Sequence, residues 1–223
     1  MNVDDVMTHL EKAGTPQTRK TYARHGVTGK MFGTSYAVIG KLTKSIKVDH
    51  SLADKLWATA NHDARVVATM VADAGIATRK QLDAWAGACD NYVLTDAVAQ
   101  LVAKTPNARA TAEAWTKSTS EFVGQAGWTV LAVLARTDPS ITDDYCMALL
   151  ARIEKSIAKG KNRVRHAMNS ALIAIGGRST KLRTAAIAAA KRIGPVSVDH
   201  GDTACETPDA VSYIGKIWAR KKG

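Results

Sequence analysis

Hydrophobic residues recur at helical spacing along almost all of the 223-residue chain, the pattern that amphipathic α-helices require. Short polar breaks and helix-start residues separate these stretches. They predict helices at 4–13, 16–25, 35–47, 51–60, 63–74, 79–88, 92–105, 108–117, 121–136, 142–157, 162–176, 181–193 and 208–220. We find no alternating pattern typical of strands, and we expect one extended segment, at 194–205. The sequence therefore predicts an all-α protein.

The predicted helices are short, consecutive and joined by brief loops, so neighbouring helices should form hairpins. Two helices with their turns give a period near the ~40 residues of HEAT-like repeats. We therefore expect a HEAT-like α-α superhelix, a solenoid with a concave basic face, in a single domain over residues 1–223. A compact irregular helical bundle is the alternative architecture.

Positive charge is concentrated near the predicted helix 162–176. Of the formal net charge of +11, most lies between Arg152 and Arg192, where eleven Lys or Arg face the single acid Glu154. Within the helix, Val164, Met168 and Leu172 form an apolar stripe, and a different face is basic. Such a face on a rigid scaffold favours a nucleic-acid partner. We expect the helix to end at Gly176–Gly177 with a positive φ.

Several classes of protein are not supported. No apolar run is long enough for a membrane span, and the acidic N-terminus lacks a signal-peptide core, so we expect a cytoplasmic protein. The three cysteines form no Cys-x-x-Cys pair and the six histidines are scattered, so we expect no metal site and no cofactor. Common nucleotide-binding and serine-hydrolase motifs are missing. Gly29 and Gly33 flank Lys30, but their spacing matches no known phosphate-binding loop.

The stretch Asp90–Ala97 holds the most informative polar residues. If a helix begins near Tyr92, then Tyr92 and Asp96 are four residues apart and share one face. An aromatic ring beside a carboxylate suits a cationic planar ligand. The alternative is structural: Asp90 caps the helix, Asp96 is a solvated or salt-bridged acid, and Tyr92 is half-buried.

Five short stretches occur in an order that is familiar: Leu56–Trp57, His62–Arg65, Asp90–Asp96, Gln125–Trp128 and Lys161–Gly176. Together they resemble the DNA alkylation repair family, the AlkD-like HEAT-repeat DNA glycosylases, over roughly the chain from Tyr22 onward. The resemblance implies a right-handed helical solenoid that grips duplex DNA in a basic cleft. It also implies cofactor-free hydrolysis of the N-glycosidic bond of cationic alkylated purines such as 3-methyladenine and 7-methylguanine.

The resemblance also implies site residues. The family's catalytic aspartate falls on Asp96 and one of its cleft aromatics on Tyr92. The cleft arginine falls on Gln125, which has no charge, and a second tryptophan falls near Ser170, which cannot stack. The residues that we expect to bind DNA are Lys161, Arg163, Arg165, His166, Gln125, Arg65, Arg24 and Lys30.

Three functions remain open from the sequence. The first is a monomeric, monofunctional DNA glycosylase acting on alkylated double-stranded DNA, with Asp96 stabilising the oxocarbenium-like sugar. The second is a HEAT-repeat scaffold without catalysis that binds damaged, branched or structured nucleic acid, which the residues at Gln125 and Ser170 favour. The third is a protein-interaction solenoid whose basic face meets an acidic partner.

Overall fold

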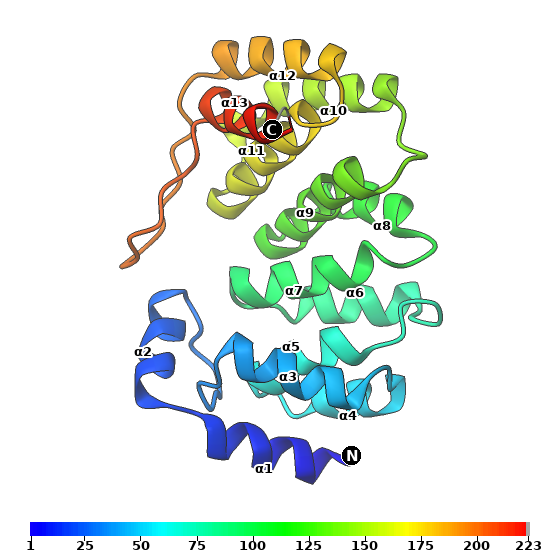
Figure 1. Ribbon diagram of the computed structural model, residues 1–223, viewed down its shortest axis with the longest axis vertical. Helices are drawn as coiled ribbons and strands as arrows, with labels where there is room; N and C mark the ends of the chain where they lie inside the picture. Colours follow the sequence, from blue (N-terminus) through cyan, green and yellow to red (C-terminus); the bar gives the residue numbers. More distant parts are fainter. Residues whose placement is uncertain (222–223) are drawn as a thin grey trace. The chain divides into compact units, whose positions relative to one another are not determined.

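The computed structural model describes residues 1–221, and their regular structure is helical throughout (Figure 1). The helices are α1 (Val3–Ala13), α2 (Pro16–Arg24), α3 (Tyr36–Ile46), α4 (His50–Ala58), α5 (His62–Val71), α6 (Arg79–Gly87), α7 (Tyr92–Val102), α8 (Ala108–Trp115), α9 (Glu121–Thr137), α10 (Asp143–Ser156), the 3₁₀ turn η1 (Ile157–Lys159), α11 (Asn162–Gly176), α12 (Thr180–Ile193) and α13 (Ala210–Arg220). Every predicted helix is present, so the all-α, HEAT-like fold class is confirmed.

Most helix starts follow the capping rules, and α8, α9 and α11 are the α-helices of residues 1–221 whose N-cap residue makes no side-chain cap bond. The side chains of Thr15 and Thr78 accept hydrogen bonds from backbone N–H groups in the first turns of α2 and α6, as N-cap residues do. Ser118, which also resembles a capping residue, lies outside α9, because that helix begins after Ser120. Asp209, rather than Thr207, caps α13. Local sequence therefore sets most of the helix boundaries.

The chain divides into two compact units. Unit 1 comprises Met1–Pro106 with Gly201–Thr203, and unit 2 comprises Asn107–His200 with the residues from Ala204 onward. In unit 1, α4 and α5 pack together as a hairpin, and α5 also contacts α3 and α7. The Trp57 and Trp85 rings stack with their centroids 4.3 Å apart, and both are buried. These tryptophans pack the core of unit 1, as helical spacing predicts for most of the tryptophans.

Asp63, in the first turn of α5, is fully buried in unit 1. Its carboxylate accepts hydrogen bonds from the backbone N–H groups of Phe32 (2.7 Å), Gly33 (3.3 Å) and Thr34 (2.7 Å). The positive end of the α5 dipole also favours a negative charge at this position. Asp63 therefore fixes the loop between α2 and α3 to the start of α5.

Gly33 occupies a position in this loop that only glycine suits. Its φ is +78°, and a Cβ there would lie 2.5 Å from Cγ of Arg19 and 2.8 Å from the carbonyl oxygen of Thr15. A side chain would be strained by the backbone conformation and would also collide with α2. The loop can therefore pass close against α2 on its way to Asp63.

In unit 2, α9 packs against both α8 and α11. A Cβ at Gly127 would lie 2.7 Å from the backbone nitrogen of Thr116, so the glycine permits close approach of α9 to the end of α8. Gly176 has a similar role, since a Cβ there would lie 2.6 Å from Cδ1 of Ile214 on α13. The predicted positive φ at Gly176–Gly177 is wrong, because Gly177 has a φ of −80°. Close packing against α13, rather than a need for positive φ, therefore explains why position 176 is a glycine.

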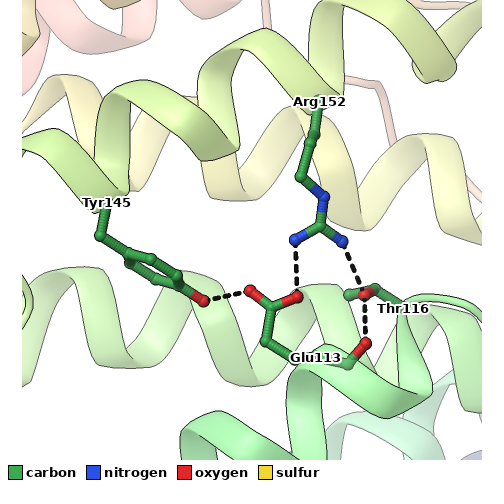
Figure 2. A network of polar contacts seen from close by, with 4 residues as sticks. All are labelled: Glu113, Thr116, Tyr145 and Arg152. Atoms are coloured by element: carbon green, nitrogen blue, oxygen red, sulfur yellow. Dashed lines mark hydrogen bonds and ion pairs between the residues drawn. The ribbon is translucent and has the colours of Figure 1, made fainter.

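A polar network joins α10 to α8 (Figure 2). Arg152 donates to Glu113 (2.6 Å) and to the Thr116 hydroxyl (2.9 Å), and the Tyr145 hydroxyl donates to the other Glu113 oxygen. Burial and the hydrogen bond to Glu113 raise the pKa of Tyr145, so its phenol stays a donor. Arg152, which belongs to the basic stretch between residues 152 and 192, therefore holds two helices together.

Residues 194–209 connect α12 to α13 without regular structure. The outgoing and returning arms meet where the His200 ring nitrogen and the Thr207 hydroxyl lie 2.9 Å apart. Asn162 at the start of α11 makes two hydrogen bonds with the backbone of Asp199, each 2.7 Å. The expected extended segment is confirmed, and its outgoing arm is attached to α11.

We predict that Asp63→Ala lowers the free energy of unfolding by about 3 kcal/mol, because three buried N–H groups lose their acceptor at ~1 kcal/mol each. Urea denaturation followed by circular dichroism measures this. Asp83→Ala, which removes the exposed ion pair with Arg79, should cost less than ~1 kcal/mol. Equal losses in the two variants would contradict the role of Asp63.

Candidate functional site

The first two turns of α7 carry Tyr92 and Asp96 in unit 1. The Asn91 side chain caps this helix by accepting a hydrogen bond from the Leu94 N–H (2.9 Å). The backbone carbonyl of Asn91 also accepts a hydrogen bond from the Thr95 hydroxyl (2.8 Å). Tyr92 and Asp96 are both partly exposed and stand one helical turn apart, ~6 Å along the axis. The predicted helix start is therefore correct and places the two residues on one face.

Two residues from elsewhere in unit 1 complete this face. The Tyr92 hydroxyl is hydrogen-bonded to Nδ1 of His25, whose ring also meets the Tyr92 ring edge-on at 5.8 Å. Tyr36 opens α3 and its side chain is 40% exposed. Partial burial and the nearby carboxylates of Asp96 and Asp63 raise the pKa of Tyr36 to about 12. Asp96 therefore lies close to a neutral, partly exposed phenol.

Sequence reasoning did not find His25 or Tyr36. His25 is 67 residues from Tyr92 along the chain, and neither residue belongs to a motif of its own. They come near α7 because Asp63 fixes the loop between α2 and α3 against α5, and α5 packs on α7. The proximity of His25 and Tyr36 to α7 therefore depends on these tertiary contacts, and no local spacing in the sequence predicts it.

The expected DNA-binding residues of unit 1 differ in their surroundings. Arg24 at the end of α2 and Lys30 in the following loop are exposed. Arg65 is half-buried, because its guanidinium lies 5.0 Å from the Trp57 ring and donates to the Trp57 carbonyl (3.3 Å). Arg24 and Lys30 are thus available at the surface, while part of Arg65 packs the tryptophan stack.

In unit 2, Lys161, Arg163 and Arg165 surround the start of α11. Lys161 is exposed and donates to the Thr119 carbonyl (2.8 Å), and the two arginines are partly exposed. Lys161 provides no side-chain cap for this helix. The Glu121 carboxylate of α9 caps it instead, accepting from the Arg163 backbone N–H (2.6 Å). Three cationic residues therefore lie at the positive end of a long helix.

His166, one turn further along α11, faces the connecting segment. Its ring meets the His200 ring edge-on, with centroids 5.6 Å apart. Burial, His200 and Arg163 lower the pKa of His166, and burial and Arg163 lower the pKa of His200 against the opposing effect of Asp199. Both imidazoles are therefore neutral at neutral pH and can pack together.

Many other cations between Arg152 and Arg192 are paired within unit 2. These pairs are Arg152 with Glu113, Lys181 with Asp144, Arg192 with Glu154, and Arg178 with the carbonyls of Ala135, Asp138, Pro139 and Ile141. The count of charges in the sequence thus overstates the charge that this part of the chain offers to a ligand. At the start of α11, three basic residues lie together and are exposed or partly exposed.

Gln125 differs from the other expected DNA-binding residues. It lies in the middle of α9 and is only 2% exposed, so its side chain faces the core of unit 2. A DNA contact by Gln125 does not fit this position, because a contact needs an exposed side chain. Ser170 on α11 is partly exposed and offers a hydroxyl in place of an aromatic ring.

No group of three or more His, Cys, Asp and Glu side chains in residues 1–221 is arranged to hold a metal ion. No helix in this range has both the length and the apolar character to cross a membrane. The polar residues described above are therefore the candidates for function.

Comparisons with known proteins agree with the all-helical, HEAT-like fold. The family model described as DNA alkylation repair enzyme matches residues 6–214. The uncharacterized proteins Lmo0209 of Listeria monocytogenes and Lin0241 of Listeria innocua are each 29% identical to this chain, over 98% and 96% of both sequences. A solved structure is similar with a TM-score of 0.91 and 27% identity, over 99% of this chain and 95% of the other. It is described as a new family of proteins related to the HEAT-like repeat DNA glycosylases with affinity for branched DNA structures.

We predict that the free energy of unfolding falls as the pH drops from 7 to 5. Burial lowers the pKa of His62, His166 and His200 in the folded protein. As the pH falls through the ordinary value of ~6.5, the unfolded chain binds protons that the folded histidines do not, and each unit of lowering is worth about 1.4 kcal/mol. Urea denaturation at several pH values measures this loss. His62→Phe should reduce the pH dependence, whereas His9→Gln, at an exposed position, should not.

Proposed function

We propose that this chain, which belongs to the DNA alkylation repair enzyme family, is a DNA-binding protein that prefers branched DNA. The observation that carries the proposal is the start of α11, where Lys161, Arg163 and Arg165 meet a helix N-terminus. Helix N-termini bind phosphate through their N–H groups and dipole. Arginine adds paired hydrogen bonds to phosphate oxygens.

The arrangement of charge supports phosphate binding in particular. Glu121 is the acid at this helix start, and its carboxylate is engaged by the Arg163 backbone N–H. The Glu121 carboxylate therefore stabilises the helix start, and Arg163 and Arg165 are partly exposed residues of the same turn. Contacts to phosphate position a protein on nucleic acid and carry no base sequence. We therefore expect recognition of DNA shape rather than of sequence.

The preference for branched DNA follows the structural relative. Its description names affinity for branched DNA structures, and the likeness extends over nearly all of this chain. The neutral, buried Gln125 also favours binding over efficient base excision, since it supplies no cation at the position that the family resemblance assigns to an arginine. A scaffold that reads backbone geometry needs neither that cation nor an aromatic ring at Ser170.

Hydrolysis of alkylated purine nucleotides is a second candidate, favoured by the Asp96 face. Asp96 is partly exposed beside Tyr36, and the Tyr92 ring is held next to it by His25. In this reaction the C1′–N bond breaks and its electron pair leaves with the cationic purine. Water adds to C1′ and loses a proton to solvent. Asp96 would stabilise the positive charge that develops on the sugar.

We expect the wild-type protein to bind a three-way or four-way DNA junction more tightly than a linear duplex of the same length. Fluorescence anisotropy with labelled DNA measures both affinities across a range of salt concentrations. Tighter binding to linear duplex, or to structured RNA, would contradict the preference for branched DNA. Binding that does not weaken as salt rises would contradict contact with phosphate altogether.

The triple variant Lys161→Gln, Arg163→Gln, Arg165→Gln should lose affinity for every DNA equally. The slope of log K against log salt should become shallower by ~0.9 for each phosphate contact removed. A matched control is Arg136→Gln, Lys216→Gln, Arg220→Gln, which removes three exposed cations from α9 and α13. The control should keep most of the affinity. Equal losses would show that net charge alone governs binding.

Excision tests the second candidate. If Asp96 catalyses hydrolysis, the wild type releases 7-methylguanine from methylated DNA and Asp96→Asn reduces the rate by about 100-fold or more. Junction binding by Asp96→Asn serves as the control for folding. No release of base by a wild-type protein that binds junctions would leave DNA binding as the function and exclude this hydrolysis.

A further inference from the structure

A small polar recess lies in unit 1 where the loop after α2 meets the first turns of α5 and α7. Its polar lining comes from Gly29, Lys30, His62, Arg65, Asp90 and Asn91. Its volume is about 10 Å³, which is close to the space that one water molecule or one oxygen atom requires.

His62 is the unusual member of this lining. Its side chain is 4% exposed, and within residues 1–221 neither ring nitrogen has a hydrogen-bond partner. Its ring meets the Tyr22 ring at 5.0 Å, a contact that satisfies no polar atom. Burial lowers the pKa of His62, so the ring is neutral and carries one N–H donor. A buried imidazole without partners is costly, which indicates that a ligand atom completes it.

The recess also lies at two helix N-termini. α5 begins at His62 and α7 begins at Tyr92, and their caps Asn61 and Asn91 use their side chains on Ala64 and Leu94. Both helices therefore direct the positive ends of their dipoles toward the recess. This field favours a ligand atom with negative charge.

Three charged groups stand around the recess. Lys30 is exposed and Arg65 is half-buried, and both provide positive charge to its lining. Asp90 is exposed and contributes a carboxylate, one oxygen of which accepts from the Asn91 amide (2.7 Å). Asp90 and the buried Asp63 beside His62 oppose the binding of an anion, and the two cations together with the two helix ends offset these two carboxylates.

We propose that this recess binds one non-bridging oxygen of a DNA backbone phosphate, with the His62 N–H donating to it and with Lys30 and Arg65 balancing its charge. This inference rests on the proposed function, because it names a second phosphate contact on the same protein. The exposed Lys30 and Asp90 side chains turn outward to admit the oxygen, since the ring nitrogens are covered. The remainder of the phosphate stays outside, as the recess has no room for it.

His62→Phe tests the contact directly. The substitution removes the donor and keeps a buried ring, so we expect the dissociation constant for a DNA junction to rise about tenfold. Stability should not fall, because the imidazole nitrogens make no internal hydrogen bond. Lys30→Met should also weaken binding, whereas Lys80→Met, at an exposed position on α6, should not. Asp90→Asn should strengthen binding.

The ¹⁵N resonances of the His62 ring give a readout that does not depend on a variant. We expect them to shift when junction DNA is added to the wild type, and not when the same concentration of inorganic phosphate is added. A shift with inorganic phosphate alone would assign the recess to a free anion and overturn the DNA assignment. Unchanged resonances in a saturated DNA complex would overturn the contact itself.

The outcomes separate this inference from the proposed function. If the wild type binds no DNA, the proposed function fails. If the wild type binds junctions and both His62→Phe and Lys30→Met bind equally well, then only the recess assignment fails. If His62→Phe does not fold, Lys30→Met and the ring resonances decide the matter.

Discussion

The carboxylate of Asp63 is the interaction on which the geometry of unit 1 depends. It is fully buried, and it is satisfied by three backbone N–H groups of the α2–α3 loop. Because these donors all belong to one short loop, Asp63 fixes that loop to the first turn of α5. The loop carries Lys30 before the contact and leads into Tyr36 after it. The positions of both candidate ligand-binding groups therefore follow from one buried acid.

Acids in unit 2 serve the structure in a similar way. Glu121 caps α11, Glu113 joins α8 to α10, and Asp143 accepts from the Ser179 hydroxyl at the start of α12. These carboxylates keep their negative charge, but their contacts hold them at helix starts and between helices. The basic character of the start of α11 thus depends on where the acids are engaged, in addition to how many cations the sequence contains.

The sequence alone predicted the helices well, and the site less well. Periodicity and caps such as Thr15 and Thr78 are local signals, so they were enough to locate each helix. The residues around Asp96 are far from it along the chain. His25 and Tyr36 come from distant segments, and no motif marks them. The direction in which Gln125 points was also missed, because α9 is apolar on most sides and one polar residue in it does not reveal its own burial.

The residues that hold the fold are largely different from those proposed to act on DNA. Asp63, Gly127 and Gly176 fix helices to their neighbours through buried contacts or close approach. Asp96, Tyr92 and Ser170 are partly exposed, so they can change with little effect on packing. Similarity to a family at the packing residues establishes the fold, whereas the chemistry depends on the partly exposed residues. Backbone binding needs exposed cations, which this chain has at Arg24, Lys30 and Lys161, whereas base excision needs a complete site.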